Sequence, residues 1–262
     1  MLNVSHISKT FSKGTINEKK ALNDLSLTLN DGDFCTVIGG NGAGKSTLLN
    51  SIAGAYLPDS GTIEINGKDV TKMSEYKRAK FIGRVFQDPL KGTAAGMQVE
   101  ENLLLASRRG ESRRLRWAFS AGDHDKYKAM VSRLDLGLED RLSTRIGLLS
   151  GGQRQALTLL MATIKRPEVL LLDEPTAALD PKTAAKVLKI TDEIVHEQHL
   201  TTLMITHNMK DALKYGNRLI MMNNGRIIAD YSEDEKKNLT IDDLLKKFEE
   251  TADAVSDRIV LG

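Results

Sequence analysis

The stretch Gly39-Gly40-Asn41-Gly42-Ala43-Gly44-Lys45-Ser46-Thr47 decides the fold, because it fits the phosphate-loop pattern in the context that the pattern requires. An apolar run, Phe34 to Ile38, precedes it, and helical spacing from Lys45 to Ala53 follows it. In such a strand, loop and helix, glycines let backbone N–H groups converge on phosphate oxygens, and the helix N-terminus adds positive potential. Lys45 is expected to reach the β- and γ-phosphates and Ser46 to offer its hydroxyl to Mg²⁺. The motif predicts a nucleoside triphosphate site, but by itself it does not separate ATPases, GTPases and small-molecule kinases.

A second motif ends in two carboxylates. The apolar run Val169 to Leu172 is typical of a central strand of a parallel sheet, and Asp173 and Glu174 follow it directly. Ligands of open α/β sheets bind at the carboxyl ends of the strands. We therefore expect Asp173 to hold Mg²⁺ through water and Glu174 to polarise an attacking water. The alternative is a pair of surface acids that end a strand before Pro175.

The composition is that of an ordinary soluble globular protein. The chain has 262 residues, of which 40% are hydrophobic and 27% charged, which suits either one large domain or one domain with a subdomain. Lys and Arg number 37 against 35 Asp and Glu, and this formal charge of +2 gives no basic stripe, so no nucleic acid partner is expected. No apolar run approaches the roughly 18 residues of a membrane span. The single cysteine, Cys35, and a start without a signal peptide predict a cytosolic chain.

The order of the remaining segments predicts an α/β fold with two additions. Leu2 to Ile7 and Leu22 to Leu29 are predicted to form an antiparallel pair. Further strands are predicted at 34–38, 61–66, 81–86, 169–172, 201–205, 218–222 and 226–230. Between Gln98 and Leu142 the periodicity is helical, which predicts an inserted helical subdomain, and from Gly152 onward helices and strands alternate as in a parallel sheet. Ile241 to Glu250 is predicted to be an exposed tail helix.

A third motif points to a family. Leu149-Ser150-Gly151-Gly152-Gln153-Arg154-Gln155 is a second glycine-bearing turn, placed before the apolar helical stretch Ala156 to Ile164. One chain thus carries two helix N-termini suited to phosphate. With this motif the sequence resembles the ATP-binding subunits of ATP-binding cassette transporters, because Leu149 to Gln153 is similar to their signature motif. The resemblance runs from about Val4 to Asp230.

Other elements of that family follow in the expected order. Gln87 is similar to the Q-loop glutamine, Ala177 to Asp180 to the D-loop, His207 to the switch histidine and Phe11 to the aromatic residue that stacks on adenine. Judged without the family, Gln87 is interpreted as a solvated loop residue and His207 as a capping histidine, while Phe11 fits a core residue and a purine-stacking residue about equally well. The D-loop departs from the family pattern, because Ala177 stands where a serine is frequent and its hydroxyl is missing.

The resemblance implies a phosphate-loop, RecA-like ATPase core with an N-terminal antiparallel β subdomain and an inserted helical subdomain at about 90–155. This cassette domain is expected over 1–239, with a helical tail over 240–262. The implied cofactors are ATP and Mg²⁺, with Glu174 and His207 catalytic and with Ser46, Gln87 and Asp173 at the metal. The implied nucleotide contacts are Phe11, Gly39, Gly40, Asn41, Gly42, Ala43, Gly44, Lys45, Ser46, Thr47, Gln87, Ser150, Gly151, Gly152, Gln153 and Asp180.

The same resemblance implies an assembly. Two copies are expected to form a head-to-tail dimer in which the phosphate loop of one copy and Ser150 to Gln153 of the other sandwich each ATP. A separate polytopic permease subunit is expected, as in bacterial importers, with a substrate-binding protein as an indirect partner. The chain would then lie peripherally on the cytoplasmic side of the cell membrane. Closure on two Mg-ATP would drive the permease through differential affinity for its two states.

The cargo is addressed only by the resemblance. Gly92 to Met97, Leu159 to Thr163 and Asp180 to Ala185 look most like a bacterial subgroup for amino-acid uptake, with tryptophan or tyrosine as cargo. A basic cluster, either a contact for anionic headgroups or a solvated face, consists of Arg108, Arg109, Arg113, Arg114 and Arg116 beside Trp117. Three alternatives to a transporter stay open here. They are a cassette ATPase acting on nucleic acid or ribosomes, a phosphate-loop kinase, and a regulatory module that binds nucleotide without hydrolysis.

Overall fold

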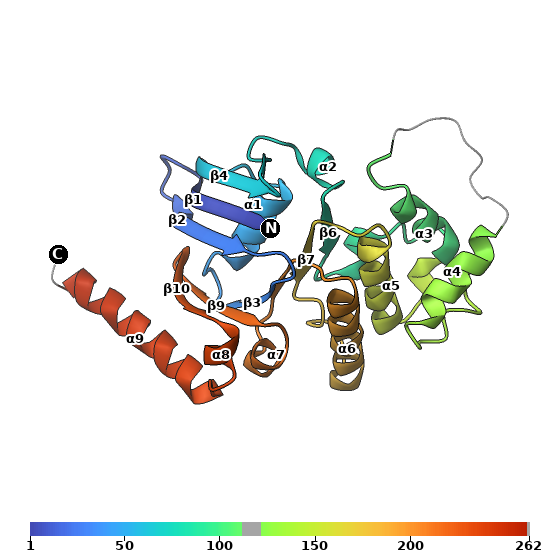
Figure 1. The fold of residues 1–262 in the computed structure, drawn as a ribbon. Helices are drawn as coiled ribbons and strands as arrows, with labels where there is room; N and C mark the ends of the chain where they lie inside the picture. Colours follow the sequence, from blue (N-terminus) through green and yellow to red (C-terminus); the bar gives the residue numbers. More distant parts are fainter. Residues whose placement is uncertain (112–121, 261–262) are drawn as a thin grey trace. The chain divides into compact units, whose positions relative to one another are not determined.

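The computed structural model describes residues 1–111 and 122–260, with side chains described to Thr251 (Figure 1). The chain forms two compact units. The first combines Met1–Lys72 with Leu203–Gly262, and the second is Met73–Thr202. The first unit is thus built from both ends of the chain, and the second from one continuous stretch. The domain boundaries expected from the sequence, 1–239 with an insert at about 90–155 and a tail at 240–262, remain predictions.

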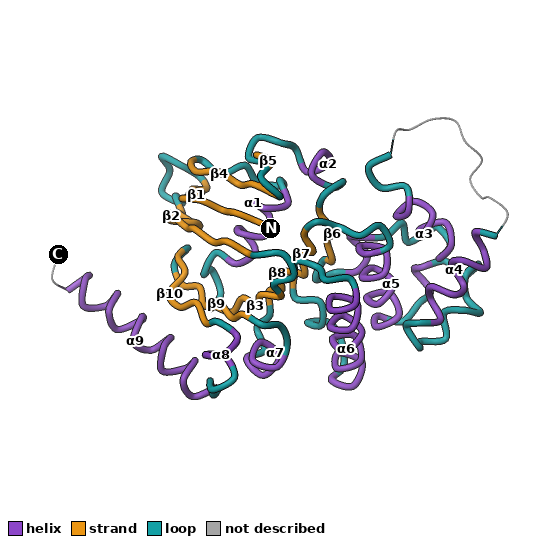
Figure 2. The backbone as a smooth tube through the Cα atoms, in the orientation of Figure 1, coloured by secondary structure: helices purple, strands orange, loops and turns teal. Residues whose placement is uncertain are grey.

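An antiparallel sheet forms the N-terminal part of the first unit (Figure 2). Its strands are β1 (Leu2–Phe11), β2 (Lys19–Leu29), β4 (Ser60–Ile65) and β5 (Lys68–Asp69), in the order β2-β1-β4-β5. The predicted pairing of the first two strands is confirmed, with Leu2 opposite Leu29. Asn66 and Gly67 join β4 to β5 with φ angles of 49° and 73°, the positive values that a type I′ hairpin turn requires.

A second group of strands lies in the same unit. It consists of β3 (Phe34–Gly39), β8 (Thr202–Ile205, whose first residue ends the other unit), β9 (Arg218–Asn223) and β10 (Arg226–Tyr231), in the order β10-β9-β3-β8. β3 and β9 are parallel, and β9 and β10 are antiparallel. The first three strands are buried along most of their length, as their continuous apolar runs predict. Helices α1 (Lys45–Ala53) and α7 (Met209–Lys214) contact β3, and α8 (Glu233–Lys236) contacts β9.

The C-terminal helix α9 (Ile241–Val260) corrects one expectation, because its first turns are not an exposed tail. Leu244 is fully buried in a cluster with Ile38, Leu219 and Met221, and Phe248 packs against the same cluster. The amphipathic spacing of α9 therefore buries an apolar stripe on the first unit, since a helix with one apolar face gains most of its stability from such packing.

The second unit holds two parallel strands and several helices. β6 (Ile82–Val85) pairs with β7 (Val169–Asp173), and α5 (Gly151–Thr163) contacts both β6 and α6 (Pro181–Glu197). The remaining elements are α2 (Glu75–Arg78), η1 (Pro89–Gly92), α3 (Val99–Ser107), α4 (Asp123–Ser132) and η2 (Ile146–Leu148). In the described part of 98–142 the structure has α3 and α4 and no strand, as the helical periodicity predicts.

The basic cluster noted beside Trp117 lies only partly within the described residues. Arg109 is not part of a solvated face, because its guanidinium donates to the carbonyls of Ala162 at 2.9 Å and Lys165 at 2.5 Å, and burial lowers its pKa. Arg113, Arg114, Arg116 and Trp117 lie outside the described residues. Among residues 1–111 and 122–260, no helix combines the length and the apolar character needed to cross a bilayer.

Candidate functional site

The phosphate loop joins β3 to α1 in a conformation that only glycine adopts without strain at two positions. Gly42 has a φ of 78° and Gly44, the N-cap of α1, a φ of 100°. A Cβ atom on Gly44 would lie 2.5 Å from the carbonyl oxygen of Ala21, so the close packing of the loop against β2 also excludes a side chain. Among residues 1–111 and 122–260, no side chain caps the first turn of α1.

Lys45 lies inside this loop. Its Nζ donates to the carbonyl oxygens of Gly39 at 2.6 Å and Gly40 at 3.0 Å, and the residue is only 8% exposed. The ammonium group is therefore held against the loop backbone, close to the N–H groups that the motif offers to phosphate. The adjacent Ser46 is exposed, so its hydroxyl is accessible to a ligand of the loop.

Phe11 ends β1, opposite Lys19 of β2. Its half-buried ring meets the ring of Tyr56 edge to face, with centroids 5.2 Å apart and planes at 79°, and Lys9 Nζ lies 5.8 Å from its centroid. Phe11 is thus a strand-end aromatic with an exposed part, and not a fully buried core residue. Lys19 Nζ also approaches the phosphate loop, since a Cβ on Gly42 would lie 3.1 Å from it. Neither Tyr56 nor Lys19 carries a local sequence signal for this role.

The two carboxylates lie at the carboxyl end of β7 as predicted, with Asp173 as its last residue and Glu174 directly after it, and Glu174 has an unusual backbone. Its φ of 46° is in the left-handed region, which is costly for a residue with a side chain and occurs preferentially at functional sites. Gln87, in the loop after β6, donates from Nε2 to Oε2 of Glu174 at 3.3 Å. The structure therefore brings together two residues that the sequence assigns separately to the metal and to water activation.

Asp173 has a partner that the sequence analysis missed. Arg84 of β6 places a guanidinium nitrogen 3.9 Å from its Oδ2, and the two side chains are 12% and 16% exposed. Sequence reasoning could have noticed Arg84 as a charged residue within a predicted buried strand, three positions before a predicted loop.

The signature-like turn begins α5 with a reciprocal capping box. Ser150 Oγ accepts from the N–H of Gln153, and the Gln153 side chain accepts from the N–H of Ser150 at 3.1 Å. Gln153 Nε2 also donates to the carbonyl of Leu136 at 3.0 Å. Ser150 remains exposed, so its own O–H proton can still be donated outward.

The D-loop aspartate Asp180 is the N-cap of α6. Its carboxylate accepts from the N–H of Thr183 at 3.1 Å, and hydrogen bonds from the Thr183 side chain and backbone lower the pKa of Asp180. Thr183 also faces Gly152 of α5, where its methyl group occupies the place of a Cβ. The second glycine of the signature-like turn is therefore required by the packing of α5 on α6.

His207 follows β8 at the carboxyl end of the strand, as predicted, and is exposed. Thr206 donates from its N–H to the carbonyl of Val37 in β3 at 3.1 Å, and Asn208 caps α7 by accepting from the N–H groups of Lys210 and Asp211. His207 is thus held by fixed neighbours between a strand and a helix, and Asn208, not His207, is the capping residue.

The candidate residues are divided between the two units. The phosphate loop, Phe11 and His207 belong to the first unit. Gln87, Asp173, Glu174, Ser150 to Gln153 and Asp180 belong to the second. Within the second unit, hydrogen bonds join Gln87 to Glu174 and Ser150 to Gln153.

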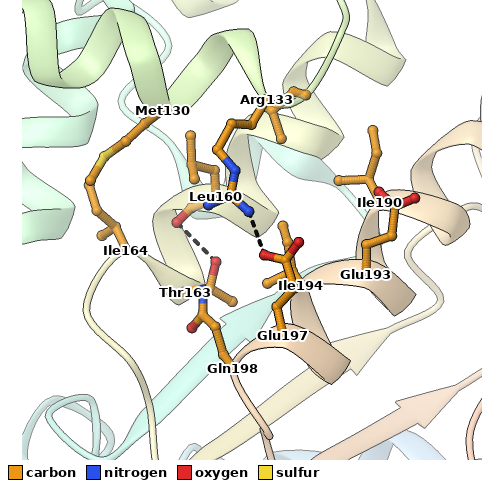
Figure 3. A pocket seen from close by; sticks show the side chains of 11 residues that line it. Met130, Arg133, Leu160, Thr163, Ile164, Ile190, Glu193, Ile194, Glu197 and Gln198 are labelled. Atoms are coloured by element: carbon orange, nitrogen blue, oxygen red, sulfur yellow. Dashed lines mark hydrogen bonds and ion pairs between the residues drawn. The ribbon is translucent and has the colours of Figure 1, made fainter.

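A separate hollow lies at the C-terminal ends of α4, α5 and α6 in the second unit (Figure 3). Its volume is about 130 Å³. It is lined by Met130, Arg133, Leu134, Leu160, Thr163, Ile164, Ile190, Glu193, Ile194, Glu197 and Gln198. Arg133 and Glu197 form an ion pair at its rim, and Thr163 bonds to the carbonyl of Leu160. No candidate residue lines it, so it is not part of the predicted site.

The donor set fits Mg²⁺. A hydroxyl, a carboxylate and an amide oxygen, from Ser46, Asp173 and Gln87, are hard ligands of the kind that Mg²⁺ accepts alongside nucleotide phosphates and water. The described residues contain no cluster of three or more His, Cys, Asp or Glu side chains that could form an all-protein cage.

Comparison with known proteins gives the family. Residues 22–177 match the model of the ABC transporter family. A tyrosine transport ATP-binding protein of Clostridioides difficile is 44% identical over 249 residues, which cover 95% of this chain and 99% of that protein. A phosphonates import ATP-binding protein of Lactococcus lactis subsp. cremoris is 33% identical over 251 residues, covering 94% and 99%.

Solved structures agree. The dimeric post-hydrolysis state of an ATP-binding cassette bound to ADP and Pi superposes with a TM-score of 0.75 at 26% identity, covering 89% of this chain and 99% of that one. The likeness confirms the predicted α/β phosphate-loop fold. The family model spans more than half of the chain, and the Clostridioides difficile protein matches the chain over nearly its full length. The chain therefore belongs to the ABC transporter family as an ATP-binding subunit, an ATPase whose cofactors are ATP and Mg²⁺.

Proposed function

We propose that this subunit powers the import of an amino acid, with tyrosine as the first candidate. The observation that carries the proposal is the 44% identity, over nearly the full length of both chains, with a tyrosine transport ATP-binding protein. The phosphonates import relative is more distant, at 33% identity. This subunit is expected to contact the permease and not the transported molecule, so the cargo assignment rests on the identity with the tyrosine transport relative.

The proposed nucleotide contacts follow from residue chemistry. Phe11 stacks on adenine with its exposed face, while Tyr56 fixes the ring from the side. The loop from Gly39 to Thr47 binds the phosphates through its N–H groups and Lys45. Ser46, Gln87 and Asp173 provide oxygen ligands for Mg²⁺, which supplies charge neutralisation at the β- and γ-phosphates.

The proposed catalytic residues are Glu174 and His207. Glu174 accepts a proton from the attacking water, and its strained backbone keeps the carboxylate at the end of β7. His207 hydrogen-bonds the γ-phosphate from its exposed position after β8. Gln87, which contacts Glu174, ties the position of that carboxylate to the position of its own loop.

A second copy of the chain completes the proposed site. Ser150 to Gln153 would bind the γ-phosphate of the nucleotide held by the partner copy, with the Ser150 O–H as donor and the N-terminus of α5 adding positive potential. Asp180 would lie at the dimer interface. The dimeric cassette structure with ADP and Pi supports this arrangement by similarity. A polytopic permease and, through it, a substrate-binding protein are the further proposed partners, and they place the subunit peripherally at the cytoplasmic face of the membrane.

Two experiments test the proposal in the native cell. The tagged chain is purified from gently solubilised membranes, and co-purification with a polytopic protein is expected. Recovery only from the cytosol, or with ribosomes or DNA, would contradict the permease partner. Uptake of labelled tyrosine is then compared between cells that express the native chain and cells that express Glu174→Gln in its place. Loss of tyrosine uptake is expected, with phosphonate uptake unchanged, and the reverse pattern would overturn the cargo assignment.

A further inference from the structure

Arg84 is a charged residue inside a short, mostly buried strand. It lies in β6 opposite Leu171 of β7, and only 12% of its side chain is exposed. One guanidinium nitrogen lies 3.3 Å from Glu75 Oε1 and the other 3.9 Å from Asp173 Oδ2. The guanidinium carbon lies 4.4 Å from the centroid of the Phe86 ring. The side chain is thus fixed by an aromatic face and two carboxylates.

This arrangement places a permanent positive charge beside a carboxylate that has little access to water. The Asp173 side chain is 16% exposed, so its charge is only partly solvated and needs a nearby counter-charge. The guanidinium stays charged at any physiological pH and is held in place by its stacking on Phe86. The Glu75 side chain is 53% exposed, so water screens its attraction to the guanidinium. The guanidinium therefore still attracts Asp173.

We infer that Arg84 is a positioning residue that acts as the resident counter-cation of Asp173, and that it sets how strongly Mg²⁺ binding and nucleotide binding reinforce each other. The inference rests on the proposed role of Asp173 as the metal carboxylate. A divalent cation that approaches Asp173 is attracted by the carboxylate and repelled by the guanidinium fixed next to it. Arg84 thereby stabilises Asp173 in the absence of metal and weakens its pull on Mg²⁺.

The measured quantity is the Mg²⁺ coupling ratio, defined as the Kd for fluorescently labelled ADP without Mg²⁺ divided by the Kd with saturating Mg²⁺. The full-length chain and ADP are used, so no hydrolysis enters the measurement. Arg84→Met removes the charge and keeps an unbranched apolar stem against Phe86. The ratio is expected to rise roughly threefold to tenfold in Arg84→Met. In Arg84→Lys, which keeps the charge, it should stay within about twofold of the native value.

A purely structural role for Arg84 predicts a different pattern. The melting temperature without nucleotide and metal should fall in Arg84→Met by about 2–4 °C, but this would also follow from lost packing. Only the counter-cation role changes the coupling ratio. Arg133→Met, which removes an exposed arginine paired with Glu197 at the separate hollow, is the matched control and should leave the ratio unchanged.

An unchanged or lowered ratio in Arg84→Met overturns the inference. If Arg84→Met does not fold, Glu75→Gln gives the test, because it removes one carboxylate that shares the guanidinium charge with Asp173 and should lower the ratio roughly twofold. An unchanged ratio in Glu75→Gln overturns the inference as well. Asp173→Asn distinguishes a failure of the proposed role of Asp173 from a failure of the inferred role of Arg84. If it abolishes the coupling while Arg84→Met does not alter it, only the role of Arg84 fails. If Asp173→Asn keeps the native coupling, the role of Asp173 fails and the inference fails with it.

Discussion

Gln87 Nε2 donates a hydrogen bond to Glu174 Oε2 across 3.3 Å, so a residue of the loop after β6 contacts the carboxylate that follows β7. The two residues belong to different motifs, one assigned to the metal and one to water activation. Their contact means that the position of the Glu174 carboxylate depends on the conformation of the Gln87 loop. Glu174 itself cannot relax easily, since its backbone has a φ of 46°.

Glu174→Gln should separate binding from hydrolysis. The amide cannot accept a proton from water, so the rate of phosphate release is expected to fall by about 10²- to 10⁴-fold, with the Kd for ATP unchanged. Light scattering with ATP should report a dimer, because ATP is no longer consumed. Glu193→Gln, an acid-to-amide change at the separate hollow, serves as the control and should hydrolyse ATP at the native rate. A Glu174→Gln chain that stays monomeric with ATP would count against the sandwich dimer.

Phe11→Ala should weaken adenine binding without affecting the phosphates. Loss of the stacked ring is expected to raise the Kd for ATP about threefold to tenfold. Tyr56→Ala, which removes the edge-to-face neighbour of Phe11, should raise it in the same direction by a smaller factor. Inorganic tripolyphosphate supplies the comparison, because it has no base and should bind all variants equally. Equal weakening of ATP and tripolyphosphate binding would show that Phe11 acts on the loop and not on adenine.

Gly152→Ala should destabilise the second unit through a specific clash. The added methyl group would occupy the space of the Thr183 methyl group, and such overpacking costs about 1–3 kcal/mol in the free energy of unfolding. Thr183→Ser removes that methyl group and keeps the hydroxyl beside Asp180, so the double variant should recover most of the loss in denaturant unfolding. Gly96→Ala, at a glycine with open space around it, is the matched control and should change stability little. Failure of Thr183→Ser to relieve Gly152→Ala would contradict this packing.

The Asp180 cap of α6 should give a pH-dependent contribution to stability. Hydrogen bonds from Thr183 lower the pKa of Asp180 below its ordinary value of 3.8, so the folded state favours the carboxylate. The stabilisation is therefore fully present above that ordinary value and is lost as the pH falls through the lower, folded pKa. The melting temperature of Asp180→Ala should lie below the native one at pH 7, and the gap should narrow under acid. Asp140→Ala, which removes one partner of an exposed ion pair, is the control, and its melting temperature should equal the native one. A difference in melting temperature for Asp180→Ala that widened in acid would contradict the capping role.

The parts of the fold that local patterns determine were predictable. The helix from Lys45 to Ala53 has the predicted ends, because Gly44 precedes it and Gly54 ends it in the left-handed conformation. The hairpin at Asn224 and Gly225 follows from a dipeptide that tolerates positive φ at both positions. The first two strands extend beyond the prediction, since their polar ends are held by pairing with each other, as Phe11 is by Lys19. The sequence of these strand ends has no apolar alternation, so it does not predict that they pair.

The motifs in the sequence name the candidate residues, but they do not reveal the contacts that these residues make. Motifs named Gln87, Asp173 and Glu174, and the structure places them at the predicted ends of strands. Arg84 could not be assigned, because its role depends on the pairing of two strands far apart in the sequence. Leu244 was missed for the same reason, since its burial depends on α9 folding back onto strands of the first unit.

The capping box of α5 uses the acceptor side of the Ser150 hydroxyl and leaves its donor side directed outward. Its oxygen accepts a hydrogen bond from the N–H of Gln153 in its own helix. Because Ser150 is exposed, its O–H proton can be donated to a group outside this unit. The hydroxyl is in this position only while the first turn of α5 is intact. A second copy that binds ATP against this turn would accordingly select chains whose α5 is fully formed. ATP-dependent dimerisation would then act as a check on the folding of its own components.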